Sequence, residues 1–104
     1  MIRHIVLLTF KPNTPQAHID DVFQELESIK AQLPGMVAIS SGKSESPEKM
    51  ERGFMHGFVA DFTDWDALQA YQDHPAHQAL GAKLIAATVG GKDGILCFDY
   101  EVTD

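Results

Sequence analysis

The sequence has a single cysteine and no long hydrophobic run. Cys97 has no partner within the chain, so an intrachain disulfide is excluded, as is usual in a reducing compartment. The longest apolar run, Ile5–Leu8, is far shorter than the roughly 18 residues of a membrane-spanning helix. The N-terminal residues pass directly into an alternating strand pattern, so we expect no secretory signal peptide. These absences predict a cytoplasmic protein that does not enter a membrane.

Positive charge is scarce as well. Only 8 Lys and Arg residues stand against 15 Asp and Glu residues, which gives a formal net charge of −7. Arg3 and Arg52 are the only arginines, and no Lys/Arg cluster offers a surface for phosphate groups. The glycines at 90, 91 and 94 match neither common phosphate-binding motif. Nucleic acid is therefore not an expected partner.

The length of the chain leaves room for one domain. Domains average about 150 residues, and this chain has 104, of which 44% are hydrophobic and 22% charged. That composition is typical of a folded globular protein. Because a domain of this size buries only about two thirds of its unfolded surface, we expect residues 1–104 to form one domain that a partner subunit stabilises.

Alternating and helical patterns divide the chain into six main elements. A first strand at 2–10 is apolar on both faces, so it is expected to be covered on both sides. A helix follows, with Thr14 at its N-cap and Pro15 at its first position. Its apolar stripe consists of Ile19, Val22, Phe23, Leu26, Ile29 and Leu33. Pro34-Gly35 is expected to stop this helix.

Further strands and helices are expected in the second half of the chain. Strands are expected at 36–43 and 53–62, separated by a polar loop. Asp64 caps a short helix, which must break before Pro75 because proline disfavours helical geometry in the residue before it. Pro75 then suits the first position of another helical piece. After a glycine-rich turn, a last strand covers 95–102.

The resulting order is β-α-β-β-α-β, which predicts an α+β, ferredoxin-like fold. Its antiparallel sheet carries both helices on one face. The other face would then expose a large apolar patch, which on a monomer marks an interaction site. That patch contains Ile5, Leu7, Met55, Val59 and either Ile95 and Cys97 or Leu96 and Phe98. A homodimer packed through these sheet faces is the simplest way to cover it.

Tyr71 and His77 are the strongest candidates for chemistry. His77 would be the third residue of its helical piece, where free N–H groups and the helix dipole disfavour the imidazolium form. The kink at Pro75 would direct the Tyr71 phenol into the same space. A neutral imidazole beside a phenol suits proton abstraction next to a carbonyl, because one group takes the proton and the other donates to the developing oxyanion.

Other interpretations of these residues remain open. A buried histidine or tyrosine often only satisfies a backbone group. His74 and His77 with His4 and His56 offer imidazoles to a metal, but Pro75 disturbs the helical register that would direct both rings at one ion. We therefore expect no metal site. Two further groups are expected to be structural: the lone thiol, Cys97, as a small buried hydrophobe, and the strand carboxylates, Asp61 and Asp99, as edge or interface charges.

Three stretches of the sequence resemble the stress-responsive α/β-barrel (Dabb) family. They are Ile2–Lys11, Gly53–Phe58 and the most specific one, Tyr71-Gln-Asp-His-Pro-Ala-His77. The closing Phe98-Asp99-Tyr100 is also similar to the family's last strand. The resemblance spans nearly the whole chain. It implies that two subunits pack their sheets face to face into a dimeric α/β barrel.

The same resemblance implies a function. One plant member of the family closes a linear poly-β-ketone thioester by an intramolecular aldol condensation, without a cofactor. Its catalytic tyrosine and histidine correspond to Tyr71 and His77, and its other pocket histidines to His4 and His56. We therefore expect cofactor-free acid–base chemistry of the aldol cyclase, lyase or isomerase type on a small carbonyl compound. In this interpretation His4, His56 and His74 bind the substrate.

Two alternative functions remain open. One is a non-catalytic, stress-responsive dimer whose pocket binds a small apolar molecule or nothing. The other is a cofactor-free oxygenase, of the kind found in related dimeric α/β-barrel families. An open pocket holding His4, His56, Tyr71 and His77 would favour the enzyme, whereas a filled core around His77 would favour the non-catalytic dimer.

Overall fold

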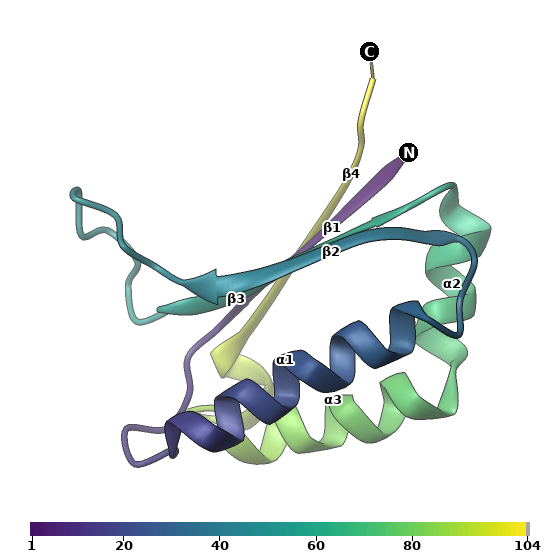
Figure 1. Cartoon of the computed structure of the whole chain (residues 1–104). Helices are drawn as coiled ribbons and strands as arrows, with labels where there is room; N and C mark the ends of the chain where they lie inside the picture. Colours follow the sequence, from purple (N-terminus) through teal and green to yellow (C-terminus); the bar gives the residue numbers. More distant parts are fainter. Residues whose placement is uncertain (104) are drawn as a thin grey trace.

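The computed structural model describes residues 1–103, in two layers (Figure 1). An antiparallel sheet of order β2-β3-β1-β4 forms one layer, and helices on one of its faces form the other. The strands are β1 (Ile2–Leu8), β2 (Met36–Lys43), β3 (His56–Phe62) and β4 (Ile95–Glu101). The helices are α1 (Gln16–Lys30), α2 (Trp65–Asp73), α3 (Pro75–Ala87) and the short 3₁₀ helix η1 (Gly91–Gly94). The expected ferredoxin-like fold is confirmed.

Strand β1 lies in the middle of the sheet and sets the register of its neighbours. Its residues alternate between buried and half-buried, as the sequence pattern predicts. His4 lies opposite Ala60 of β3 and opposite Asp99 of β4. Directly paired residues share a face of the sheet, so the Asp99 side chain lies on the same face as His4.

The hydrophobic core fills the space between the sheet and the helices. Every second residue of β1 and β3 points into it, and α1 contributes the stripe that its sequence predicts. Its buried members are Ile2, Val6, Leu8, Val22, Leu26, Ile29, Met36, Phe58, Ala60, Phe62, Leu68, Tyr71, Leu80 and Leu84. We call the sheet face that lines this core the inner face.

The opposite face of the sheet, here called the outer face, is not covered by any helix within residues 1–103 (Figure 1). Leu96, Phe98 and Tyr100 of β4 are 44%, 58% and 39% exposed. In register with them, Ile5 and Leu7 of β1 are half-buried. The sequence left two sets of β4 residues open for this face, and the register selects the set with Leu96 and Phe98.

Both ends of helix α1 differ from the expected ones. Pro15 rather than Thr14 is the N-cap of α1, and no side chain caps that end. The N–H of Thr14 instead donates to the Lys11 carbonyl at 3.0 Å, so Thr14 belongs to the preceding turn. At the other end α1 stops at Lys30, and Leu33 reaches the core from a turn rather than from the helix.

Strand β3 starts three residues later than the alternation of 53–62 suggests. Arg52 and Gly53 have φ angles of 54° and 92°, in the left-handed region that interrupts an extended strand. Pairing therefore begins at His56, opposite Leu8. The prediction failed here because alternation of side chains contains no information about the backbone angles that precede a strand.

The boundary between α2 and α3 agrees with the prediction. The Asp64 carboxylate accepts a hydrogen bond from the Ala67 N–H at 2.8 Å and caps α2, a contact typically worth about 1 kcal/mol. His74 has extended backbone angles, φ −66° and ψ 133°, and Pro75 starts α3. Among the described residues, no helix is long and apolar enough to cross a membrane.

Candidate active site

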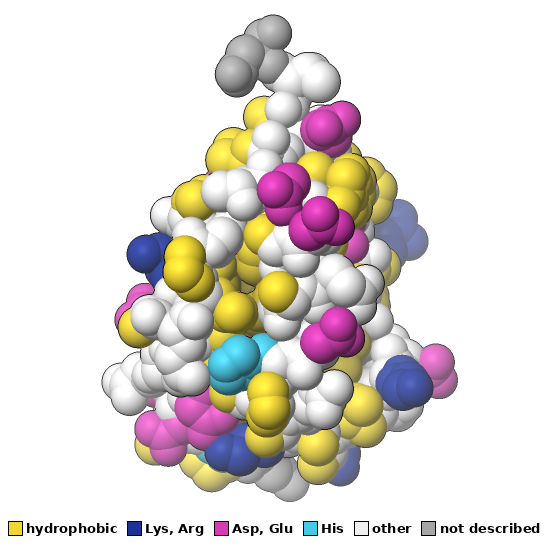
Figure 2. Space-filling view, turned by 90° about the vertical axis from the view of Figure 1, so that its right-hand side faces the viewer, with side chains coloured by type: hydrophobic (Ala, Val, Ile, Leu, Met, Phe, Trp, Pro, Cys, Tyr) yellow, Lys and Arg dark blue, Asp and Glu magenta, His cyan; other side chains and the backbone are white. Residues whose placement is uncertain are grey.

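A cavity of about 370 Å³ lies between the inner face of the sheet and α3. This volume is within the range of small-molecule pockets, about 300–1,000 Å³. Most of its wall is apolar, and the apolar members include Val6, Leu26, Phe58, Leu80, Leu84 and Ile95. Figure 2 shows one side of the molecule, on which a histidine is visible among hydrophobic side chains around a hollow. The space around His77 is therefore not a filled core, which is the arrangement that would favour a non-catalytic dimer.

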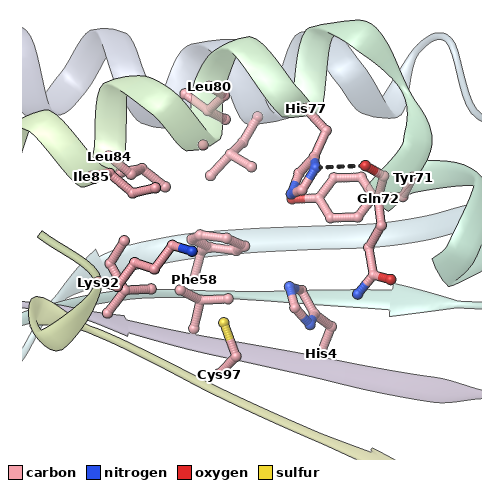
Figure 3. A pocket seen from close by; sticks show the side chains of 14 residues that line it. His4, Phe58, Tyr71, Gln72, His77, Leu80, Leu84, Ile85, Lys92 and Cys97 are labelled. Atoms are coloured by element: carbon pink, nitrogen blue, oxygen red, sulfur yellow. Dashed lines mark hydrogen bonds between the residues drawn. The ribbon is translucent and has the colours of Figure 1, made fainter.

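Tyr71 and His77 lie together at one end of this cavity (Figure 3). Tyr71 is near the end of α2 and is 1% exposed, whereas half-buried His77 is the third residue of α3. The extended His74 between the helices turns the chain, so that the two rings pack with their centroids 4.2 Å apart. The kink at Pro75 thus brings together the pair that the sequence singled out.

The surroundings of His77 favour a neutral ring with one defined tautomer. Burial lowers its pKa below the ordinary value; a hydrogen bond to the Gln72 carbonyl opposes this, and His4 and His74 add to the lowering. A carbonyl can only accept, so the Nδ1–H of His77 donates to Gln72 at 3.2 Å. The lone pair then resides on Nε2, which is available as a base.

The Tyr71 phenol is held in its protonated form. Burial raises its pKa well above the ordinary value, because the phenolate would lose its hydration. Figure 3 shows the hydroxyl end of the ring beside the imidazole of His77. Tyr71 is therefore a hydrogen-bond donor, and His77 is an acceptor, at the same end of an apolar cavity.

His4 faces this pair from the sheet, and its partner Asp99 was not anticipated as a site residue. His4 is 5% exposed on β1, with its ring centroid 5.9 Å from that of Tyr71. Its Nδ1–H donates to the Asp99 carboxylate at 2.5 Å, which fixes the ring and leaves Nε2 without that proton. Asp99 lies on the edge strand β4, as expected of an edge charge, and its carboxylate in addition binds His4. The contact between His4 and Asp99 follows from the register of β4 against β1, which cannot be read from the sequence.

His56 does not line the cavity, although it lies on the inner face. Its partner in β1 is Leu8, four residues from His4, which corresponds to about 13 Å along the strand. The His56 ring packs against Phe10, with centroids 5.2 Å apart. The expectation that His56 lines the same cavity as His4 is therefore wrong: a shared face does not give a shared pocket.

His74 is also outside the cavity. Its Nδ1 accepts a hydrogen bond from the Ala76 N–H at 3.1 Å and caps the start of α3. This contact uses the ring to satisfy a free N–H group of the helix. His74 therefore does not line this cavity, and its ring caps the kink that positions His77.

Three other polar or reactive side chains line the cavity: Gln72, Lys92 and Cys97. Cys97 was expected to be a buried hydrophobe, but it is exposed, because β4 is an edge strand without a helix above it. Asp61, by contrast, lies on the outer face and forms a bidentate ion pair with Arg3, at 2.9 and 3.2 Å. No group of three or more His, Cys, Asp or Glu side chains within residues 1–103 gathers as metal ligands would.

Gly81 keeps part of the cavity open. It lies inside α3, where glycine costs roughly 1 kcal/mol relative to alanine, and it lines the cavity. A Cβ atom added there would meet no atom within 4 Å. The missing side chain thus corresponds to empty space rather than to close packing.

Comparison with known proteins agrees with this fold and with the sequence motifs. The model of the stress responsive A/B barrel domain family matches residues 2–102. The chain belongs to this family. It is 28% identical over 101 residues to the stress-response A/B barrel domain-containing protein At5g22580 of Arabidopsis thaliana, covering 96% of this chain and 85% of that protein.

Solved structures extend the comparison. A dimeric ferredoxin-like protein of unknown function from Jannaschia sp. CCS1 is 34% identical, with a TM-score of 0.91 and coverage of 97% and 98% of the two chains. The hydroxynitrile lyase of Passiflora edulis is 20% identical, with a TM-score of 0.86 and coverage of 99% and 94%. SnoaB, a cofactor-independent oxygenase of Streptomyces nogalater, is 16% identical, with a TM-score of 0.76 and coverage of 99% and 93%. The last two likenesses concern the fold alone.

Proposed function

We propose that this stress-responsive A/B barrel protein catalyses acid–base chemistry on a small carbonyl compound, without a cofactor. The observation that carries the proposal is the pairing of Tyr71 with His77 at one end of an apolar cavity. The geometry supplies a base in its neutral form next to a donor that stays protonated. A hydroxynitrile lyase and a cofactor-independent oxygenase share this fold, which supports catalysis on it and, through the oxygenase, catalysis without a cofactor.

The proposed reaction begins with proton abstraction next to the carbonyl. The Nε2 atom of His77 takes a proton from the carbon beside the carbonyl, and the electron pair of the broken C–H bond moves onto the carbonyl oxygen. The Tyr71 hydroxyl donates a hydrogen bond to this enolate oxygen as its charge develops. In an aldol reaction the enolate carbon then attacks a second carbonyl, and the alkoxide that forms takes the proton from the His77 imidazolium. In an isomerisation the same imidazolium protonates the enolate at another carbon.

His4 and Asp99 have a supporting role in this proposal. The Asp99 carboxylate fixes the His4 ring, so that the other ring nitrogen, Nε2, points from the sheet into the cavity (Figure 3). In this tautomer Nε2 accepts a hydrogen bond from a hydroxyl group or an enol of the substrate. A rigid acceptor opposite Tyr71 and His77 would orient the substrate between the helix layer and the sheet.

We also propose that two copies pair through their outer faces. The three side chains that β4 exposes there, Leu96, Phe98 and Tyr100, are all large, and a contiguous apolar patch is typical of an interaction surface. The Jannaschia protein is described as dimeric. We expect a symmetric dimer that buries more than about 1,200 Å² in total, as specific interfaces do.

The alternative of a non-catalytic dimer retains one supporting observation. The apolar walls of the cavity suit a small apolar ligand whether or not it is turned over. No feature of the cavity favours the oxygenase interpretation specifically.

A matched pair of tyrosine variants separates these functions. Tyr71→Phe removes one hydroxyl from the cavity, and Tyr100→Phe removes one from the outer face. We expect Tyr71→Phe to lose most of the turnover of enolisable ketones, and His77→Ala to lower it by roughly 10²–10⁴-fold. Exchange of the α-hydrogens of methyl hexyl ketone in D₂O, followed by NMR, measures the first step without knowledge of the natural substrate. Tyr100→Phe should exchange at the wild-type rate.

Thermal melts of the three variants show whether a loss of exchange reflects unfolding. His77→Ala leaves a cavity and is expected to lower stability, so Tyr71→Phe is the cleaner probe. If Tyr71→Phe and His77→Ala both exchange as the wild type does while their melting temperatures shift, the pair is structural. The non-catalytic dimer would then replace the enzyme.

A further inference from the structure

The cavity has a second polar end, formed by Lys92. This residue lies in η1, directly after α3, and its side chain lines the cavity. Figure 3 shows its ammonium group over the Phe58 ring, directed toward the apolar middle of the cavity. None of the ion pairs formed within residues 1–103 includes Lys92. Its charge is therefore available to a bound molecule.

The backbone positions that carry the two polar groups are well separated. His77 is near the start of α3 and Lys92 follows its end, and the ten residues from His77 to Ala87 span about 15 Å of helix. The sheet gives a similar spacing, because the four residues from Asp99 to Ile95 span about 13 Å of strand. The wall between the ends is apolar. The cavity thus has an acid–base end, an apolar middle and a cationic end.

We propose that the compound bound here is an amphipathic anion: a carbonyl group lies beside Tyr71 and His77, an apolar chain fills the middle, and a carboxylate or phosphate group binds Lys92. The carbonyl part of this assignment rests on the proposed function, whereas the anionic part rests on Lys92 alone. Lys92 is the one Lys or Arg residue that lines the cavity. The chain as a whole carries a net charge of −7, and Figure 2 shows Asp and Glu side chains on the face that it presents.

Binding of matched chains tests the proposal without any turnover. Octanoate, octyl phosphate and octanol share one apolar chain and differ in the head group, and calorimetry gives their affinities for the whole protein. We expect both anions to bind more tightly than octanol. Lys92→Met should weaken the anions by about two- to fivefold, as loss of a solvated ion pair does, and should leave octanol unchanged. Lys92→Arg should restore anion binding.

Lys30→Met is the control for net charge, because Lys30 ends α1 outside the cavity. Equal effects of Lys30→Met and Lys92→Met would overturn the proposal, as would equal binding of the anions and octanol. Failure of all three chains to bind would also overturn it, since the apolar middle would then not hold a chain. The anion with the higher affinity, octanoate or octyl phosphate, shows whether the site prefers a carboxylate or a phosphate head group. Tyr71→Phe should still bind octanoate, so failure of the proposed catalysis is distinguishable from failure of this proposal.

Discussion

The two faces of the sheet are similar in sequence but opposite in surroundings. On the inner face, Val6 is 3% exposed beneath the helices, whereas on the outer face Phe98 is 58% exposed. Each face also holds an aspartate: Asp99 fixes His4 on the inner face, and Asp61 pairs with Arg3 on the outer face. One face is closed by the chain's own helices and encloses a cavity, and the other offers a flat apolar surface.

This comparison separates two uses of hydrophobic residues. Burial by the chain itself stabilises the fold, and each inner-face residue contributes to it directly. Apolar surface left open stabilises the protein only when something covers it, so its contribution depends on subunit concentration. Changes of the same chemical type on the two faces should therefore have different consequences, which the following variants measure.

The largest effect is expected from a charge on the outer face. Phe98→Asp would place a carboxylate on each side of a symmetric dimer, where burial without a partner costs several kcal/mol. We expect the dissociation constant to rise at least about a thousandfold, equivalent to about 4 kcal/mol. Sedimentation at micromolar concentration should then show a folded monomer. Trp65→Asp, which changes an exposed aromatic residue of α2, should stay dimeric. A Phe98→Asp protein that remains a dimer would place the interface elsewhere.

The inner face should show the larger loss of stability on truncation of a leucine. Leu26→Ala removes a fully buried side chain, and we expect a loss of about 3 kcal/mol in the free energy of unfolding, from lost transfer energy and the cavity that remains. Leu96→Ala, made on the outer face in the monomeric Phe98→Asp chain, should lose less than about 0.5 kcal/mol. Urea unfolding of both variants in that same chain gives the comparison. Equal losses would show that the outer face is packed within one subunit.

The two aspartates offer a comparison of function. Asp99→Asn alters the partner of His4 and should lower turnover by about 10–100-fold, as loss of a residue that orients a site group does. Asp61→Asn makes the same chemical change on the outer face and should leave turnover unchanged at subunit concentrations that keep the dimer. Steady-state rates of both variants on one substrate give the ratio. If Asp61→Asn lowers turnover as much as Asp99→Asn, both effects report on the fold.

Much of the fold was predictable, because its signals are local. Alternation placed the strands, helical periodicity placed α1, and Asp64 and Pro75 marked the ends of two helices. Tyr71 and His77 were found for the same reason, since only a short kink separates them. The failed boundaries, at Thr14 and before His56, depend on turn conformations that side-chain patterns do not determine.

The rest of the site depends on register and on the three-dimensional path of the chain. Asp99 joins His4 only because β4 pairs with β1 in one particular register. His56 shares the inner face but lies too far along it, and the sequence contains no measure of that distance. Lys92 enters the cavity because η1 returns to the sheet beside Ile95. Each of these facts joins segments that are distant in sequence, so no local pattern indicates them.

The smallest expected effect is a change in the pH dependence of turnover, and a comparison of two histidines identifies the group that causes it. The pKa values of His77 and His56 both lie below the ordinary 6.5, in each case mainly because burial disfavours the charged ring. If neutral His77 is the base, turnover rises as the pH passes through the lowered pKa of His77 and then stays constant until the hydroxyl of Tyr71 ionises above pH 10. Below the pKa of His77 it falls about tenfold per pH unit.

The same lowered pKa values also affect stability, so the two causes of an acid decline must be separated. The unfolded chain binds more protons than the folded one between the folded pKa and 6.5, so the stability linked to His77 is fully present above pH 6.5 and is lost as the pH falls through the folded pKa. Circular dichroism at each pH shows whether the protein is still folded where turnover declines. His56→Gln removes the other histidine with a lowered pKa and should leave the acid limb where it is. If His56→Gln moves the limb, or if the decline follows the loss of folded signal, the limb reports unfolding and His77 is not the titrating base.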